Sequence, residues 1–147
     1  MVTAIDKRPM FKSLSVEWPT PQKLFNELDA EFHFTLDVCA AQGNAKCDRF
    51  FTEKEDGLVQ SWAQEVCWMN PPYGRDLKYW MGKAFLEWVR GATVVCLVPA
   101  RTDTFWWADW ALRSSEIRFL RGRIRFGTGK GRATFPSCVV VFRGSPR

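Results

Sequence analysis

Histidine and paired cysteines are scarce in this sequence, and their scarcity excludes several classes of enzyme. His33 is the only histidine, and no two of the five cysteines are separated by two residues. A zinc site of mixed cysteine and histidine ligands therefore has almost no ligands to draw on, and a serine or cysteine nucleophile has almost no histidine to activate it. We expect neither a metal site nor a triad hydrolase. The odd number of cysteines favours buried thiols over a disulfide framework.

Long apolar runs and low-complexity segments are also absent from the sequence. No run approaches the roughly 20 apolar residues of a membrane-spanning helix, and the N-terminus lacks the apolar core of a secretory signal. Apolar residues make up 46% and charged residues 25% of the 147 residues, as in globular proteins. We expect a cytoplasmic protein with no membrane partner. It would have an N-terminal arm over residues 1–14 and a single domain over residues 15–147.

Charge is divided unevenly between the two halves of the chain. Residues 1–73 contain 7 Lys and Arg and 11 Asp and Glu. Residues 74–147 contain 14 Lys and Arg and only 5 Asp and Glu. Six basic residues and no acidic residue lie between positions 118 and 132. Within this stretch Arg121, Arg123 and Arg125 alternate with other residues, which would place three guanidinium groups on one side of a strand or ribbon. Such a surface suits the phosphates of nucleic acid; a solvated basic surface is the alternative.

The apolar pattern predicts an α/β fold, because strand-like and helix-like segments alternate along the chain. The predicted strands are 32–39, 66–69, 93–98, 117–120 and 138–142, and the last two would form a C-terminal antiparallel hairpin. The predicted helices are 21–28, 58–63, 79–89 and 104–113. Thr20 would cap the first helix, with Pro21 at its first position.

The most distinctive segment is Asn70-Pro71-Pro72-Tyr73, directly after the predicted strand 66–69. Two prolines cannot continue a central strand, so the chain must turn there and form a rigid rim at the end where open α/β sheets bind ligands. The tetrapeptide resembles motif IV of the amino-methyltransferases, and the resemblance implies an amine as the substrate. An aromatic amine is a poor nucleophile because its lone pair is delocalised into the ring. If the Asn70 side-chain oxygen and the Pro71 carbonyl accept its hydrogens, the lone pair is directed at an incoming methyl group. The Tyr73 ring would stack on a base turned out of its duplex.

Further segments extend the resemblance to the methyltransferases, in order along the chain. They are Trp18-Pro19-Thr20-Pro21, residues 36–40, 44–47, 56–58 with Trp62, 99–104, and 121–123 with Phe126. Over about residues 15–143 the ordered set resembles the phage and prophage DNA N-6-adenine methyltransferase family, Dam-like. The resemblance implies transfer of a methyl group from S-adenosylmethionine to N6 of a flipped adenine in DNA. It also implies a protein encoded by a phage or prophage and active in a bacterial cell.

The resemblance further implies a reduced Rossmann-like methyltransferase fold with a mostly parallel sheet. Only 32 residues separate Asp37 from Asn70, too few for the two further strand-helix units of a full methyltransferase sheet. At the implied cofactor site, Asp37 would hold the methionine amino group and Thr20 would lie near the methionine carboxylate. The other implied cofactor residues are Trp18, Pro21, Ala40, Asn44, Asp56 and Asn70. Motif I departs from the usual glycine-rich pattern, since Gly43 is the only glycine in this run.

We expect DNA to contact an arginine shortly after strand 93–98 and several residues of the basic stretch. These residues are Arg101, Arg121, Arg123, Arg125 and Phe126. Arg101 has an alternative partner in Asp103. Two other functions are compatible with the sequence: a nucleic-acid-binding module without catalysis, and a protein glutamine methyltransferase, which the basic C-terminal half disfavours. No segment is long enough for a separate target-recognition domain, so we expect weak sequence preference.

Overall fold

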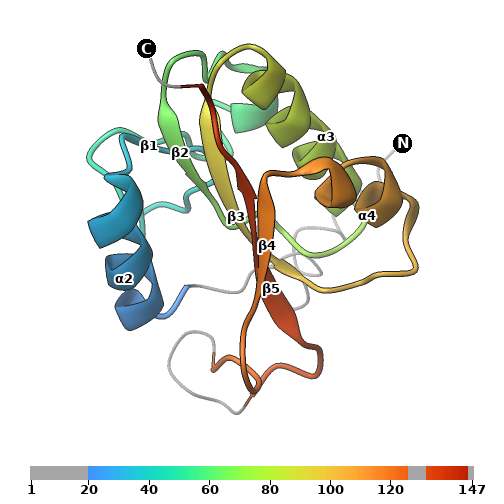
Figure 1. The fold of residues 1–147 in the computed structure, drawn as a ribbon. Helices are drawn as coiled ribbons and strands as arrows, with labels where there is room; N and C mark the ends of the chain where they lie inside the picture. The colour runs from blue at the N-terminus through green and yellow to red at the C-terminus, as the bar shows by residue number, and fades with distance from the viewer. Residues whose placement is uncertain (1–19, 126–131, 146–147) are drawn as a thin grey trace, which may run out of the picture.

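One five-stranded sheet with helices on both faces forms the fold. The computed structural model describes residues 20–125 and 132–145, and the predicted arm, residues 1–14, lies outside them. The strand order is β1-β2-β3-β5-β4. Figure 1 shows α2 on one side of the sheet and α3 and α4 on the other. The α/β class predicted from the apolar pattern is confirmed.

Three parallel strands form one half of the sheet. β1 (Leu36–Asp37) pairs with β2 (Val66–Met69), which pairs with β3 (Thr93–Pro99). β2 and β3 are almost entirely buried, because helices cover both faces of the sheet. Their parallel order puts the carboxyl ends of all three strands at the same edge. Between β1 and β2 the chain adds only an isolated bridge from Phe50 to Asp37, in agreement with the expected reduced sheet.

The other half of the sheet is an antiparallel hairpin. β5 (Ser137–Phe142) lies between β3 and β4 (Glu116–Phe119) and runs opposite to both. The predicted C-terminal hairpin is therefore confirmed, whereas the expected parallel order holds only for β1 to β3. Since β4 runs in the same direction as β3, the loop from β4 to β5 begins at the edge where the parallel strands end (Figure 1).

Helix α2 (Gln22–Phe32) covers one face of the sheet. Its buried residues Phe25, Leu28 and Phe32 follow helical spacing, and the Phe25 ring meets the Trp68 ring edge to face, with centroids 5.4 Å apart. The predicted strand over 32–39 is wrong for most of its length. The helix continues to Phe32, and His33 ends it with a left-handed φ of 58°. Only β1 remains of that strand.

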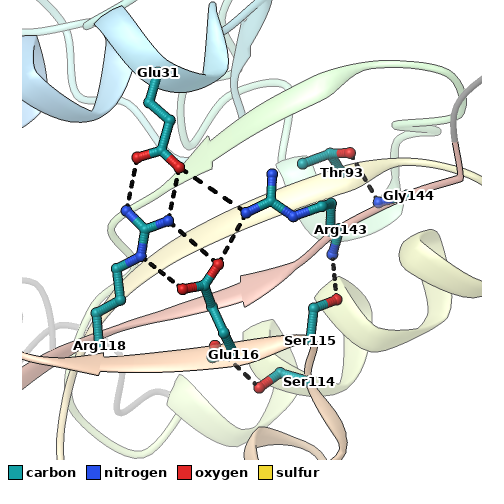
Figure 2. A network of polar contacts seen from close by, with 8 residues as sticks. All are labelled: Glu31, Thr93, Ser114, Ser115, Glu116, Arg118, Arg143 and Gly144. Atoms are coloured by element: carbon teal, nitrogen blue, oxygen red, sulfur yellow. Dashed lines mark hydrogen bonds and ion pairs between the residues drawn. The ribbon is translucent and has the colours of Figure 1, made fainter.

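An ion-pair network ties the end of α2 to the β4–β5 hairpin (Figure 2). Arg118 of β4 donates to both carboxylate oxygens of Glu31, each at 2.7 Å, and also contacts Glu116. Arg143, just after β5, donates to Glu116 at 2.8 Å and lies over the ring of Phe32. Paired guanidinium and carboxylate groups of this geometry fix direction as well as distance. The network therefore positions α2, and it occupies Arg118, one of the six basic residues expected to face nucleic acid.

Three helical elements cover the opposite face: α3 (Leu77–Val89), α4 (Phe105–Asp109) and the 3-10 helix η3 (Ala111–Arg113). The predicted helix over 104–113 is thus interrupted at Trp110, whose ψ of −48° and φ of −127° break the helical run. The helix predicted over 58–63 is shorter than expected. It consists of the 3-10 helix η2 (Gly57–Val59).

Glu87 of α3 is fully buried and holds the chain between η2 and β2 against the helix. Its Oε1 accepts the backbone N–H of Trp62 at 2.9 Å, and its Oε2 accepts from Lys83 at 2.7 Å. Lys83 also donates to the carbonyl oxygen of Gln60 at 2.6 Å. Burial alone would raise the pKa of Glu87, but the hydrogen bonds from Lys83 and Trp62 outweigh it, and the net pKa is lowered. The carboxylate therefore keeps the charge that the hydrogen bonds from Trp62 and Lys83 favour.

All five cysteines lie in the described part of the chain, and none forms a disulfide. Cys67, Cys96 and Cys138 are buried in the sheet. Burial raises the pKa of Cys138 to about 12 and that of Cys96 well above its usual value. These thiols stay protonated and act as small apolar core residues, as the sequence predicted.

Candidate functional site

A cleft of about 760 Å³ lies at the carboxyl ends of β1 and β2. Small-molecule sites commonly have this size. The predicted residues that line it come from separate segments of the chain: Thr20, Asp37, Ala40, Asn44, Asp56, Asn70, Pro71 and Pro72. Two other described residues of the predicted cofactor and catalytic set, Pro21 and Tyr73, are not part of the lining, nor are the four arginines predicted to contact DNA. Trp18 and Phe126 lie outside the described residues.

Asp37 ends β1 and is 3% exposed. Its Oδ2 accepts the backbone N–H of Lys46 at 2.9 Å, and its Oδ1 accepts that of Cys39 at 3.2 Å. Burial raises the pKa of this carboxyl, and the two hydrogen bonds oppose the shift. A carboxylate so poorly solvated is stabilised by a nearby cation. Asp37 therefore shapes the loop at the cleft and offers a site for a positive group.

The loop over 39–46 forms the wall of the cleft beside Asp37. The buried Ala40 donates its N–H to the carbonyl of Phe51 at 2.8 Å, and Asn44 Oδ1 accepts the N–H of Ala41 at 2.8 Å. Small side chains at such a loop let a ligand approach the backbone. Lys46, which the sequence analysis missed, ties this loop to α2 by donating to Gln22 Oε1 at 2.7 Å. The two residues are 24 positions apart in the sequence, so no local sequence pattern indicates this contact.

η2 and α3 supply another part of the wall. Asp56 has a φ of 59° and caps η2 by accepting the N–H of Leu58 at 3.1 Å. Trp80 of α3 also lines the cleft. Its spacing along the helix predicts a core residue, and only the position of η2 shows that it faces a cavity. Further lining residues that the sequence did not predict include Thr52, Glu53, Lys54, Trp68 and Asp76.

Gly57 packs so closely against the chain after β1 that no side chain fits there. A Cβ at this position would collide with the carbonyl oxygen of Val38 and also touch the Trp80 ring. We expect Gly57→Ala to lower the free energy of unfolding by about 1–3 kcal/mol, because the backbone at Val38 must shift. Gly43→Ala is the control for thermal unfolding: nothing lies within 4 Å, so only the strain of its positive φ, about 1 kcal/mol, applies. Gly57→Ala with no greater effect than the control would contradict this packing.

Asn70 directly follows β2 and lies between two hydroxyl groups. Its Nδ2 donates to Thr20 Oγ1 at 2.8 Å, and its Oδ1 accepts from the hydroxyl of Tyr73 at 2.7 Å. Thr20 is 7% exposed, and Pro21 rather than Thr20 occupies the N-cap position of α2. The predicted capping role of Thr20 is therefore wrong. Its hydroxyl contacts the predicted catalytic side chain instead.

Tyr73 is buried, with 2% of its surface exposed. Its ring meets Phe135 edge to face with centroids 5.7 Å apart, and its hydroxyl also lies 3.0 Å from the carbonyl oxygen of Leu97. Burial raises the pKa of Tyr73 well above its usual value, so the hydroxyl stays protonated and able to donate. Stacking of this ring on a base, as the sequence predicts, would require Tyr73 to move.

Arg101 follows β3 and supports the turn at residues 70–73. Its Nη1 donates to the carbonyl oxygen of Tyr73 at 3.0 Å, and its guanidinium lies 5.6 Å from the centroid of Phe135. These contacts, and not the alternative pairing with Asp103, are the ones found between described residues. A contact of Arg101 with DNA stays a prediction.

Arg121, Arg123 and Arg125 are exposed in the loop that follows β4. β4 ends at Phe119, and Gly122 has a left-handed φ of 74°. The predicted strand or ribbon with three arginines on one side is therefore not formed. The loop nevertheless begins at the sheet edge where β1 and β2 reach the cleft (Figure 1).

The part of the chain that the structure describes contains neither a cluster of metal ligands nor a membrane-spanning helix. Within residues 20–125 and 132–145, no three histidine, cysteine, aspartate or glutamate side chains are placed to hold a metal ion. The helices described there are all too short or too polar to cross a membrane.

Comparison with known proteins identifies the family. The family DNA N-6-adenine-methyltransferase (Dam) matches residues 9–142. A DNA N-6-adenine-methyltransferase of Haemophilus phage HP1 is 31% identical over 133 residues, which cover 85% of this chain and 77% of that protein. Another, of Escherichia phage T1, is 26% identical over 102 residues, which cover 68% of this chain and 42% of that protein. The chain therefore belongs to the Dam family of DNA N-6-adenine methyltransferases.

Proposed function

We propose that this member of the Dam family transfers a methyl group from S-adenosylmethionine to N6 of adenine in DNA, with Asn70 as the group that binds the reacting amine. The observation that carries the proposal is the position of Asn70. It ends a buried parallel strand, lines the cleft, and has its carboxamide held by two hydroxyl groups. Three parallel strands followed by an antiparallel hairpin support a reduced Rossmann-like methyltransferase fold.

The cleft fits S-adenosylmethionine in size and in charge. Its volume of about 760 Å³ is within the range of small-molecule sites. The buried carboxylate of Asp37 would bind the methionine ammonium group, which would relieve the poor solvation of this carboxylate. For the adenosine part, Trp80 offers an apolar surface and Asp56 offers a hydrogen-bond acceptor. Ala40 and Asn44, on the loop over 39–46, would also contact the cofactor. When bound, the sulfonium of this cofactor supplies an electrophilic methyl group and leaves as a neutral thioether.

The turn at residues 70–73 supplies two hydrogen-bond acceptors on adjacent residues. Asn70 Oδ1 and the carbonyl oxygen of Pro71 would each accept one hydrogen of the adenine amine, which orients its lone pair for in-line attack. Pro71 and Pro72 keep this turn rigid because their φ angles are fixed. A carboxamide oxygen is too weak a base to keep a proton, so the proton released from the amine passes to water once the new N–C bond has formed.

The basic loop after β4 supports DNA as the substrate. Arg118 is occupied by Glu31 and Glu116, but Arg121, Arg123 and Arg125 are exposed. Contacts to phosphate position DNA without reading its sequence. We therefore expect adenine methylation with weak preference for flanking bases, and Arg101 would contribute through the turn that it supports.

Replacing Arg121, Arg123 and Arg125 together by alanine should lower methylation of all DNA sequences alike. The dependence of log affinity on log salt should also flatten, by about 1 for each lost phosphate contact. Rates and affinities on two unrelated duplexes over a range of KCl concentrations measure both effects. Arg90→Ala, which removes a positive charge at the end of α3, is the control. An unchanged salt dependence in the triple variant would place DNA on another surface.

Methyl transfer with a labelled cofactor tests the proposed function. Purified protein is incubated with S-adenosylmethionine carrying a tritiated methyl group and with duplexes that contain or lack adenine. We expect label in the adenine-containing duplex alone. Calorimetry with the cofactor is an independent measurement, since a nucleic-acid-binding module without catalysis would give no heat of cofactor binding. Label in protein, or in adenine-free DNA, would contradict the proposal.

A further inference from the structure

The Asn70 carboxamide makes contact with two parts of the chain that are distant from each other in sequence. Thr20, 50 residues away, lies just before α2, and Tyr73 lies three residues further along the turn. Thr20 is held in place because α2 packs Phe25 on Trp68 and is anchored at its other end by the Glu31 ion pairs. The docking of α2 on the sheet therefore reaches the predicted catalytic side chain.

The two ends of a carboxamide have opposite hydrogen-bonding chemistry. Oδ1 only accepts and Nδ2 only donates. An amine that presents its hydrogens can bind Oδ1 but is repelled by Nδ2, so a half-turn of the Asn70 side-chain amide would convert an attractive site into a repulsive one. Productive binding of an amine requires one of the two orientations.

In the structure the carboxamide lies in one orientation, with Oδ1 towards Tyr73 and Nδ2 towards Thr20. Tyr73 is held between Asn70 Oδ1 at 2.7 Å and the Leu97 carbonyl oxygen at 3.0 Å, and the shorter distance is the one to Asn70. A buried phenol of raised pKa keeps its proton and so donates it. Thr20 Oγ1 then accepts from Nδ2 on the other side. Both ends of the carboxamide are thus matched to a partner.

We infer that Thr20 and Tyr73 are positioning residues, which act through the Asn70 carboxamide and keep its oxygen available in one orientation. This inference rests on the proposed function, in which Asn70 binds the adenine amine. In this arrangement Tyr73 contributes its hydroxyl group. A phenylalanine in its place would keep the ring but lack this hydroxyl group.

Kinetics of Tyr73→Phe and Thr20→Val test the inference. Each variant should lose about 10-fold or more in kcat for DNA methylation at saturating cofactor, while the thermal unfolding midpoint changes little. Because Tyr73 does not line the cleft, Tyr73→Phe should also leave the Kd for S-adenosylmethionine unchanged. Thr20→Ser restores a hydroxyl and should recover most of the rate lost in Thr20→Val. Tyr79→Phe, which removes the exposed phenol of the only other tyrosine, is the matched control. A wild-type kcat in Tyr73→Phe would overturn the inference and favour a role for the ring.

Two further measurements separate this inference from the proposed function. In the double variant, the fold loss in kcat should be smaller than the product of the losses in Thr20→Val and Tyr73→Phe, because both residues act on the same carboxamide. A loss equal to that product would overturn the shared mechanism.

NMR of the Asn70 side-chain NH₂ group needs neither DNA nor cofactor. Its resonances should move towards those of a solvated amide in Thr20→Val, and unchanged resonances would overturn the inference. Absence of methylation by the wild-type protein would instead contradict the proposed function.

Discussion

Asn70→Ala should reduce methyl transfer to DNA at least 100-fold and leave the affinity for S-adenosylmethionine nearly unchanged. The loss corresponds to roughly 3 kcal/mol of transition-state stabilisation, as expected when one preorganised hydrogen-bonding group is removed from an active site. The lone pair of the adenine amine is then no longer oriented by the acceptor that follows β2. Single-turnover rates and calorimetric titration of the cofactor measure the two quantities separately.

Asn26→Ala is the matched control for this variant. Asn26 is exposed on α2, where it accepts a hydrogen bond from Gln22, and its removal deletes the same chemical group far from the turn at residues 70–73. We expect its rate of methyl transfer to stay near that of the wild-type protein. A rate in Asn70→Ala close to the control would refute the assignment of Asn70.

Asp37→Ala should show the reverse behaviour, with cofactor affinity about 10- to 100-fold weaker. The charge-assisted hydrogen bond to the methionine ammonium group is worth roughly 1.5–3 kcal/mol, and the loop over 39–46 also loses the two N–H contacts that fold it. The apparent KM for the cofactor rises accordingly. Asp48→Ala removes an exposed carboxylate close in sequence and serves as the control. Equal affinities of the two variants would show that Asp37 does not bind the cofactor.

The same carboxyl group makes cofactor binding depend on pH. Burial raises the pKa of Asp37, and an ammonium group binds its ionised form. Affinity therefore falls as the pH drops through this raised pKa, at a higher pH than an ordinary aspartate would allow. The surroundings shift the pKa of Glu31, Glu55, Glu87 and Glu116 in the opposite direction, to below the usual value of a glutamate. The decline should be absent in Asp37→Asn, and its persistence there would assign it to another group.

The elements that sequence alone predicted well are those whose residues are consistent with one structure only. β2 is a short apolar run that two prolines end, and β3 is an almost entirely apolar run that begins soon after Gly91. Both patterns are local, and burial on both faces of a sheet accounts for them. The apolar pattern placed Asn70 directly after β2, and the family resemblance placed Asp37 at the end of the first strand. The two residues do line one cleft.

The region around Phe32 was predicted incorrectly because two periodicities overlap there. Phe25, Leu28 and Phe32 follow helical spacing, whereas Phe32, Phe34 and Leu36 follow the alternation of a strand. The helix prevails because its apolar side packs on Trp68, a contact across more than 40 residues of chain. A local pattern of apolar residues contains no information about such a long-range contact.

The hydrogen bonds at Asn70 were beyond prediction for a related reason. The proline after Thr20 indicates a helix cap, and the methyltransferase motif indicates a stacking ring for Tyr73. The Thr20 hydroxyl meets Asn70 because α2 packs against the sheet beside β2, whereas the Tyr73 hydroxyl reaches Asn70 within the turn. Tertiary packing, which no spacing encodes, decides which polar groups face each other.

Mass spectrometry of nucleosides is the most direct test of DNA adenine methylation at Asn70. DNA incubated with wild-type protein and S-adenosylmethionine is digested and compared with DNA incubated with Asn70→Ala. We expect N6-methyl-2′-deoxyadenosine from the wild-type reaction alone, and no methylated cytosine in either. Methylated cytosine as the product, or equal amounts of N6-methyl-2′-deoxyadenosine from both proteins, would contradict the assignment of this chemistry to Asn70.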